Sequence, residues 1–127
     1  MKIDSIDHVV FTVRDIEATC QFYAKVLGME IASFGENRKA LSFGSQKINL
    51  QQLGRESTLI AAKPTPGSAD VCFVTSESLD DVLNHLKGYG VEVIAGPVER
   101  NGAQGMMMSL YFRDPDMNLV EVSKYNS

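Results

Sequence analysis

Several features that would identify a function directly are missing from this sequence of 127 residues. It has no tryptophan and only two cysteines, Cys20 and Cys72, which lack the Cys-x-x-Cys spacing of redox and zinc motifs. No phosphate-binding loop, dinucleotide fingerprint, nucleophile elbow or zinc-finger spacing occurs. The two cysteines are therefore expected to be reduced and buried, and the chemistry must come from other side chains.

Long apolar runs and clusters of basic residues are also missing. No run approaches the roughly 18 apolar residues of a membrane-spanning helix, and the first residues lack the hydrophobic segment of a secretory signal. The net charge of −4 argues against nucleic acid and anionic membranes as partners, because both are bound by clustered lysine and arginine. We therefore expect a cytoplasmic protein whose partner is a small molecule.

The sequence does contain an internal repeat. The stretch 6–31 returns in altered form over 69–93, and at one constant offset His8 falls opposite Asp70. A repeat of this kind indicates two copies of one structural module. Each copy of about 60 residues would be only marginally stable alone, so both are expected to share a core within a single domain over 1–127.

The limits of the two modules follow from composition. Module one is expected over about residues 4–54 and module two over about residues 69–125. The segment between them, about residues 55–68, loses its hydrophobic periodicity and ends in the run Lys63-Pro64-Thr65-Pro66-Gly67-Ser68. Proline, glycine and serine in such density are typical of a linker.

Each module is predicted to begin with a strand and an amphipathic helix. The strands cover 6–13 and 70–74, and the helices begin at the N-cap residues Asp15 and Ser78. Gly28 is expected to end the first helix in a left-handed conformation. Alternation and turn residues predict three further strands in each module, at 29–33, 39–43 and 47–52 and at 91–95, 107–112 and 117–123. Residues 96–105 are expected to form a loop and residues 113–116 a turn. The fold class is therefore α+β, with two tandem βαβββ modules.

Four polar residues occupy equivalent places in the two modules: His8 and Asp70 on the first strands, Asn49 and Glu121 on the last strands. Imidazole nitrogen with carboxylate and amide oxygens suits divalent Mn, Fe, Zn or Mg. Simpler explanations exist, because His8 can bond a backbone carbonyl, Asp70 can be a turn residue and Asn49 is a weak metal ligand. Glu121 is hardest to explain otherwise, since a buried carboxylate needs a cation or hydrogen-bond partners.

Other polar and soft side chains have structural explanations. His85 lies between apolar positions of the second helix and is expected to be a partly exposed helix residue. Met106, Met107 and Met108 are either strand packing or a pliable apolar lining.

Both ends of the chain resemble one family. The residues that carry the resemblance are Asp7-His8-Val9, Phe22-Tyr23, Val26-Leu27-Gly28, Phe112-Arg113-Asp114-Pro115-Asp116 and Asn118-Leu119-Val120-Glu121. They are similar to the vicinal oxygen chelate superfamily, which includes glyoxalase I, the fosfomycin-resistance thiol transferases, the bleomycin-binding resistance proteins and the extradiol dioxygenases. Residues 63–70 are closest in character to small proteins of the glyoxalase domain-containing protein 5 type.

The resemblance implies a U-shaped mixed sheet around a divalent metal that chelates two neighbouring oxygens of a substrate, and it implies a homodimer. His8 matches the family's first-strand histidine and Glu121 its last-strand glutamate. Asp70 stands where many members have a second histidine, which argues against extradiol dioxygenase chemistry. Asn49 stands where glyoxalase I has another glutamate. The predicted metal ligands are His8, Asp70 and Glu121, with Asn49 as a further candidate, and the metal is Mn, Ni, Zn, Fe or Mg.

Our leading functional hypothesis is a metal-dependent lyase or transferase resembling glyoxalase I, the lactoylglutathione lyase. The metal would act as a Lewis acid, and Glu121 would be the catalytic residue that ligates it or moves a proton. One alternative is a non-catalytic binding or resistance protein that holds a small molecule against an apolar lining including Val10, Cys72 and Met107. A second alternative, a thiol transferase of the fosfomycin type, rests on fold analogy.

Overall fold

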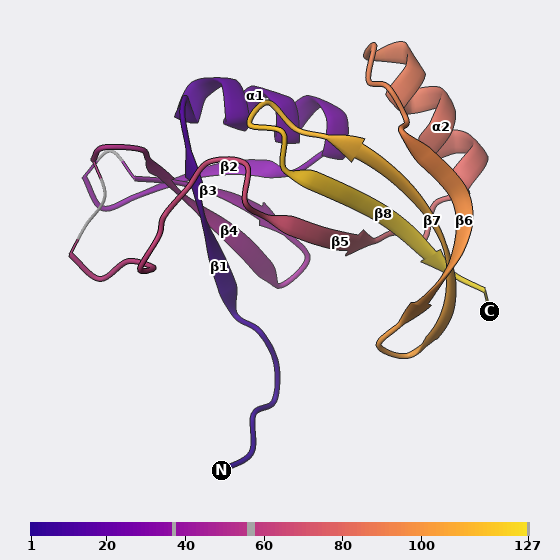
Figure 1. The fold of residues 1–127 in the computed structure, drawn as a ribbon, viewed down its shortest axis with the longest axis horizontal. Coiled ribbons are helices and arrows are strands. Elements are labelled where there is room, and N and C mark those ends of the chain that lie inside the picture. Colours follow the sequence, from indigo (N-terminus) through magenta and orange to yellow (C-terminus); the bar gives the residue numbers. More distant parts are fainter. Residues whose placement is uncertain (37, 56–57, 127) are drawn as a thin grey trace. The chain divides into compact units, whose positions relative to one another are not determined.

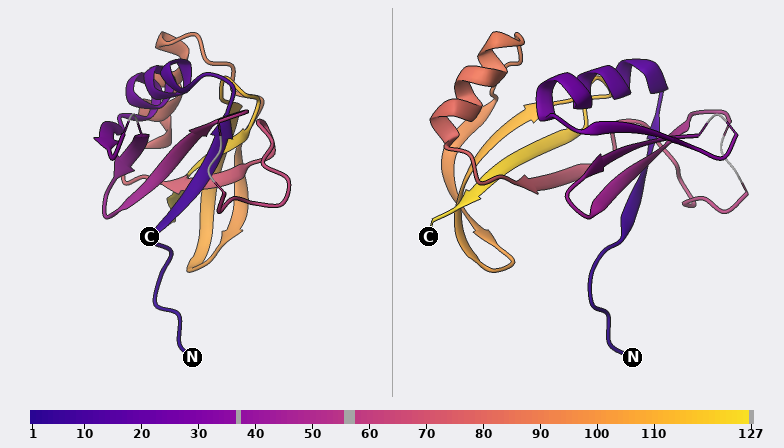
Figure 2. Two further views of the ribbon diagram at one scale, coloured as in Figure 1. Left: turned by 90° about the vertical axis from the view of Figure 1, so that its left-hand side faces the viewer. Right: turned by 180° about the vertical axis from the view of Figure 1, so that it is seen from behind.

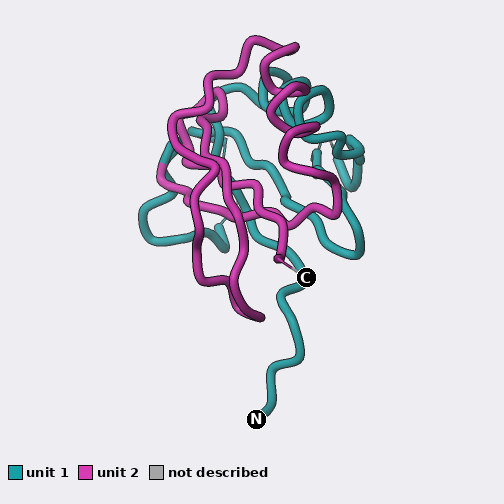
Figure 3. The backbone as a smooth tube through the Cα atoms, turned by 90° about the vertical axis from the view of Figure 1, so that its right-hand side faces the viewer, with its two compact units in different colours: residues 1–67 teal, residues 68–127 magenta. Residues whose placement is uncertain are grey.

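The computed structural model describes residues 1–36, 38–55 and 58–126. The chain divides into two compact units, Met1–Gly67 and Ser68–Ser127, called unit 1 and unit 2 below (Figure 3). Within the described residues each unit is a βαβββ module with one helix and a four-stranded mixed sheet (Figure 1). The predicted α+β class with two tandem modules is confirmed. Asn37, between two predicted strands, and residues 56 and 57 of the predicted linker lie outside the described residues.

Unit 1 follows the predicted order of elements. These are β1 (His8–Val13), α1 (Ile16–Leu27), β2 (Glu30–Phe34), β3 (Arg38–Phe43) and β4 (Gln46–Gln52). The strand order in the sheet is β1-β4-β3-β2. Strands β1 and β4 are parallel, and the other two pairs are antiparallel. Helix α1 therefore serves as the crossover from β1 at one edge of the sheet to β2 at the other edge.

Helix α1 begins and ends at the residues that the sequence indicates. The Asp15 carboxylate accepts a hydrogen bond from the Ala18 backbone N–H at 3.1 Å, and Gly28 ends the helix in a left-handed conformation at φ 69°. On the buried face, the Tyr23 ring packs edge-on against Phe11 of β1, with 6.5 Å between the ring centroids. This contact joins the helix to the apolar face of the sheet.

Unit 2 repeats the arrangement. Its elements are β5 (Asp70–Val74), α2 (Leu79–Gly88), β6 (Ala95–Gly102), β7 (Gly105–Arg113) and β8 (Leu119–Tyr125). The strand order β5-β8-β7-β6 matches that of unit 1, with β5 and β8 parallel. Ser78 caps α2 by accepting from the Asp81 N–H at 3.2 Å, as predicted. Each helix packs against its own sheet (Figure 2). Among the described residues, no helix is long and apolar enough to cross a membrane.

The sequence misplaced the strand after α2. Residues 91–94 are not a strand, whereas Ala95–Gly102, mostly predicted as a loop, forms β6. Gly96 and Pro97 favoured a loop in the sequence, but a register shift between Ala95 and Val98 accommodates both residues within the strand. Strand β8 also begins later than predicted, because Met117 takes a φ of 70° in the preceding turn.

The apolar face of the unit 2 sheet is formed by residues that alternate along β7 and β8. Leu110 pairs with Val122 and Phe112 with Val120, and all four side chains are buried. The residues between them point to the opposite face, because strand side chains alternate. That opposite face carries Ser109, Tyr111, Glu121 and Ser123, and it is called the polar face of unit 2 below.

Candidate functional site

The two units present equivalent positions for the predicted site residues. In unit 1 the parallel pair β1 and β4 sets Val10 beside Asn49. In unit 2 the parallel pair β5 and β8 sets Cys72 beside Glu121. Asn49 and Glu121 are thus counterparts, as the sequence predicts. His8 and Asp70 lie two residues before Val10 and Cys72, so each shares a sheet face with its unit's last-strand polar residue.

Unit 1 contributes His8 and Asn49. The exposed His8 ring has its Nδ1 2.8 Å from a carboxylate oxygen of Asp7, an arrangement that orients the imidazole and leaves Nε2 available. The side-chain oxygen of Asn49 is buried and accepts no hydrogen bond from any residue that the structure describes. A buried acceptor without a donor is costly. Both groups therefore have an atom suited to an external ligand.

Unit 2 holds Glu121 in a hydrogen-bonded network on its polar face. The Ser123 hydroxyl donates to the Glu121 carboxylate at 3.1 Å. The same hydroxyl oxygen lies 2.6 Å from the hydroxyl of Ser109 and 3.2 Å from the thiol of Cys72. Ser109 and Ser123 are both fully buried. The carboxylate of Glu121 is therefore held by a hydrogen bond from a buried hydroxyl and not only by solvent.

Tyr111 and Arg100 extend this network across β7 to β6. Tyr111 lies opposite Glu121 in the register of β7 and β8. Its hydroxyl accepts a hydrogen bond from Arg100 Nε at 2.9 Å. Burial raises the pKa of the Tyr111 hydroxyl, and the charge of Glu121 and a hydrogen bond with it act in the same direction, against the lowering effect of Arg100. Tyr111 is therefore protonated at neutral pH and can donate a hydrogen bond to an anion.

Cys72 differs from the expectation for the cysteines. Cys20 is buried in α1 as predicted, but Cys72 is exposed because β5 points it to the polar face rather than to the core. Partial burial of its sulfur raises the pKa of the Cys72 thiol, a hydrogen bond with Ser123 lowers it, and the Glu121 and Asp70 charges raise it further. A thiol that keeps its proton is a poor nucleophile. This cysteine therefore does not favour covalent catalysis.

The loop between β7 and β8 fixes the beginning of β5. Asp114 is buried, and its Oδ1 accepts from the backbone N–H groups of Asp116 at 2.9 Å and Asn118 at 3.0 Å. Its Oδ2 accepts from the Asn118 side-chain amide at 2.8 Å. The Asn118 side-chain oxygen in turn accepts from the Ala69 N–H at 2.8 Å. The predicted turn is thus confirmed, and it also positions Asp70, the next residue after Ala69.

The predicted metal ligands come from both units. His8 and Asn49 belong to unit 1, and Asp70 and Glu121 to unit 2. Over the described ranges, no three His, Cys, Asp or Glu side chains gather into a metal-binding cluster. The set of His8, Asp70 and Glu121 therefore stays a prediction. The nitrogen and oxygen donors of these residues suit a hard or borderline divalent cation. The Asn49 oxygen, which has no hydrogen-bond donor among the described residues, is consistent with a role as a ligand of that cation.

Four residues of the polar network were not singled out from the sequence: Arg100, Ser109, Tyr111 and Ser123. A signal for three of them was present, because Ser123 lies two residues after Glu121, and Ser109 and Tyr111 alternate in the same way along the neighbouring strand. Arg100 could not be found, since its strand was predicted as a loop.

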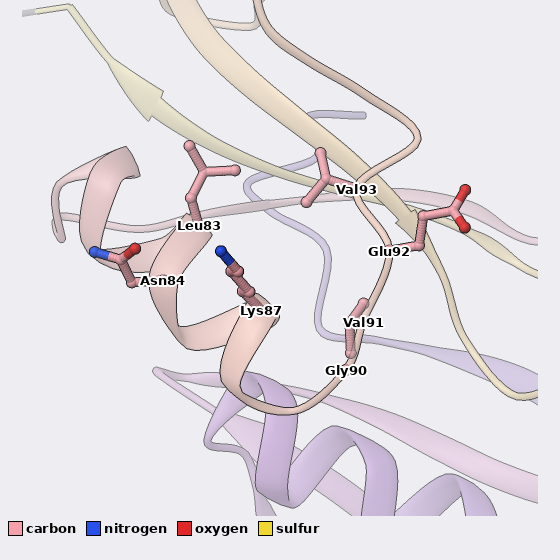
Figure 4. A pocket seen from close by; sticks show the side chains of 7 residues that line it. All are labelled: Leu83, Asn84, Lys87, Gly90, Val91, Glu92 and Val93. Atoms are coloured by element: carbon pink, nitrogen blue, oxygen red, sulfur yellow. The ribbon is translucent and has the colours of Figure 1, made fainter.

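Unit 2 also has an open pocket of about 380 Å³ away from these residues. It lies between α2 and the segment after it (Figure 4). Its lining combines apolar side chains with Lys87 and Glu92: Leu83, Asn84, Lys87, Gly90, Val91, Glu92 and Val93. None of the predicted site residues lines it. His85 on α2 is exposed, as expected, and its ring lies 4.9 Å from that of Tyr89.

Comparisons with known proteins cover both units. Residues 5–122 match the family model described as the Glyoxalase/Bleomycin resistance protein/Dioxygenase superfamily. The chain is 54% identical over 125 residues to virulence protein STM3117 of Salmonella typhimurium, with 98% of this chain and 87% of that protein covered. It is 50% identical to the glyoxalase domain-containing protein RDO1 of Mycosarcoma maydis, with 98% and 70% covered. The solved structure of an integron cassette protein from the V. cholerae mobile metagenome has a TM-score of 0.97 at 55% identity, with 99% and 98% covered.

Proposed function

The chain belongs to the glyoxalase, bleomycin resistance protein and dioxygenase superfamily, and on that premise we propose that it is a divalent-metal-dependent enzyme resembling glyoxalase I. Its substrate would be a small molecule with two neighbouring oxygen atoms. The observation that supports this most is the Glu121 carboxylate, which buried Ser123 holds on the polar face of unit 2. A carboxylate fixed in this way suits metal ligation or proton transfer.

The proposed metal ligands are His8, Asp70 and Glu121, with Asn49 as a further candidate. The metal, when bound, would act as a Lewis acid that withdraws charge from the substrate oxygens. Asp7 would keep the His8 ring in one orientation through its 2.8 Å contact with Nδ1. Because the ligands come from both units, a homodimer could combine unit 1 of one copy with unit 2 of another. Sedimentation equilibrium tests the dimer.

Glu121 is the proposed proton carrier. Its carboxylate would take a proton from the substrate carbon next to an oxygen and return it to the neighbouring carbon. The Ser123 hydroxyl would stabilise the ionised carboxylate, and the protonated Tyr111 hydroxyl could donate to it as well. Asn49 occupies the position in unit 1 that is equivalent to Glu121, and its amide cannot act as a base. The Glu121 carboxylate alone would therefore both remove the proton and return it.

Calorimetric titration of metal-stripped protein with Mn²⁺, Ni²⁺ and Zn²⁺ tests the metal site. Wild-type protein is expected to bind at least one of these ions, and His8→Ala and Glu121→Gln should each weaken binding by about tenfold or more. Glu92→Gln removes an exposed carboxylate of unit 2 that is not among the proposed ligands, and it serves as the matched control. Absence of binding, or binding that neither site variant changes, would refute the proposal.

Turnover is tested separately with the hemithioacetal of methylglyoxal and glutathione as the probe substrate. Metal-loaded wild-type protein is expected to convert it, and Glu121→Gln should lower kcat by about a hundredfold or more, since general acid–base catalysis contributes that much. Metal binding without any conversion would exclude this hemithioacetal as a substrate but would still support the proposed metal site.

One observation favours a non-catalytic binding protein instead. The Glu121 carboxylate already accepts a hydrogen bond from Ser123, so it has a partner on the polar face without a metal. Buried Met107 adds an apolar side chain to the same sheet face. A rise in melting temperature with small ligands in the presence of a chelator would support this function, and a strict dependence on metal would contradict it.

A further inference from the structure

The geometry points to Arg100 as the residue that recognises an oxyanion of the ligand, a carboxylate or a phosphate, on the polar face of unit 2. This inference deepens the proposed function, because it assigns a charged group to the substrate. It rests on that proposal only for the placement of the substrate's reacting oxygens near Glu121. Recognition of the oxyanion itself requires no metal.

The backbone directs Arg100 to the polar face. Arg100 on β6 lies opposite Met107 on β7, and Met107, Ser109 and Tyr111 alternate along that strand. Residues opposite each other in an antiparallel pair share a sheet face. The arginine side chain therefore leaves β6 on the same side as Glu121.

Three contacts hold the guanidinium in place. Its Nε donates to the Tyr111 hydroxyl at 2.9 Å, and its Nη1 donates to the Glu99 backbone carbonyl at 2.9 Å. Its central carbon lies 5.4 Å from the centre of the Tyr111 ring, within the range of a cation–π contact. A side chain ordered before binding loses less conformational entropy when a ligand arrives. Arg100 is thus prepared for a ligand at its exposed end.

The positive charge of Arg100 has no counter-ion in the described part of the chain. No Asp or Glu oxygen there lies within ion-pair distance of it, although the chain has more acidic than basic residues, 16 against 12. A guanidinium carries five N–H donors, and the Tyr111 and Glu99 contacts use only part of them. The remaining donors form a planar fork, which matches a carboxylate or a phosphate. An oriented and unpaired arginine is therefore suited to an external oxyanion.

The network also sets the distance between the oxyanion and the reacting oxygens. Arg100, Tyr111 and Glu121 stand on the successive strands β6, β7 and β8. Arg100 is aligned with Met107 on β7, whereas Glu121 is aligned with Tyr111, four residues further along the same strand. At about 3.4 Å per residue along a strand and about 4.8 Å between strands, the backbones at Arg100 and Glu121 are separated by roughly 17 Å. The Arg100 side chain covers much of this distance, because its Nε reaches the hydroxyl of Tyr111, and a small molecule would span the remainder. Tyr111 acts between them as a positioning residue for Arg100.

Three probes test the inference: glycerol, glycerate and glycerol 3-phosphate. All three carry neighbouring oxygens, but glycerol is neutral, glycerate adds a carboxylate and glycerol 3-phosphate adds a phosphate. Each is titrated into the metal-free full chain, in chelator at constant ionic strength, and amide chemical shifts report the Kd. At least one anion is expected to bind about tenfold or more tightly than glycerol. Comparison of the two anions distinguishes carboxylate from phosphate recognition.

Variants then assign the effect to Arg100. R100Q is expected to abolish the preference for the anion, and R100K to keep part of it, because lysine retains the charge but not the fork. Tyr111→Phe removes the acceptor that orients Arg100 and should reduce the preference less than R100Q. Lys87→Gln makes the same change in charge on α2 of the same unit and should leave the preference unchanged. Amide shift dispersion confirms that each variant is folded.

Two results would overturn the inference: absence of a preference for either anion in the wild-type chain, including no binding at all, or a preference that survives in R100Q. The outcome is independent of the metal titration. Discrimination between anion and glycerol without metal binding would refute the proposed metal function and keep this inference. Metal binding without discrimination between anion and glycerol would support the proposed metal function and refute this inference.

Discussion

Removal of the Asp114 carboxylate should destabilise unit 2 strongly. In Asp114→Ala, two backbone N–H groups and the Asn118 side-chain amide lose their acceptor inside a buried loop. A buried donor left without a partner costs about 1–3 kcal/mol, and because such losses are not additive we expect a total of about 3–5 kcal/mol. Asp114→Asn keeps the Oδ1 acceptor but sets an NH₂ group against the Asn118 amide, so its cost should be about half as large.

Urea denaturation followed by circular dichroism gives the change in the free energy of unfolding. The control is Asp80→Asn, an exposed carboxylate in the first turn of α2, for which we expect a loss of less than about 1 kcal/mol. Hydrogen exchange provides a local measurement, because the Ala69 N–H donates to Asn118 and should lose protection in Asp114→Ala. A stability of Asp114→Ala within error of the control, or unchanged exchange at Ala69, would show that this loop does not fix the beginning of β5.

Three further predictions concern single positions. Glu121→Gln removes an anion that raises the pKa of the Cys72 thiol, so this pKa should fall and more thiolate should be present at pH 7.5. Alkylation of Cys72 by iodoacetamide should then become faster, as peptide mass spectrometry can measure. An equal or slower rate would contradict the interaction between Glu121 and Cys72. Gly96→Ala should lose more than about 2 kcal/mol in thermal unfolding, because φ is +98° and the new Cβ would collide with the Ser109 carbonyl oxygen. Asp15→Ala should cost about 0.5–2 kcal/mol through loss of the N-cap bond, and a smaller change than for an exposed control such as Glu17→Gln would refute that assignment.

The sequence predicts the fold well where a local signal has one structural meaning. The helix caps are Asp15, Ser78 and Gly28. The side chains of Asp15 and Ser78 suit the N-cap position, and the backbone freedom of Gly28 suits the end of a helix. The repeat predicts that both modules share a strand order, and the registers of Val10 with Asn49 and Cys72 with Glu121 agree with it. The resemblance to the vicinal oxygen chelate superfamily is confirmed by the family model, and the fold agrees with that of the integron cassette protein.

Prediction failed where two local signals conflict. Gly96 and Pro97 are typical of loops, yet a bulge keeps them in β6, and the strand that carries Arg100 was missed for this reason. Cys72 was expected to be buried because cysteine usually is, but the alternation of β5 turns it to the polar face. The buried serines of that face have no sequence signature, since serine is equally common in turns and on surfaces.

The central claim, a divalent metal held by Glu121 together with His8, is tested most directly by diffraction from crystals grown with Mn²⁺. The anomalous difference map should contain a peak at bonding distance, about 2.2 Å, from the Glu121 carboxylate and from a His8 imidazole. Asp70 or the Asn49 oxygen would complete the ligand set. An anomalous peak elsewhere, or none at Glu121 in a crystal with saturating Mn²⁺, would contradict the claim.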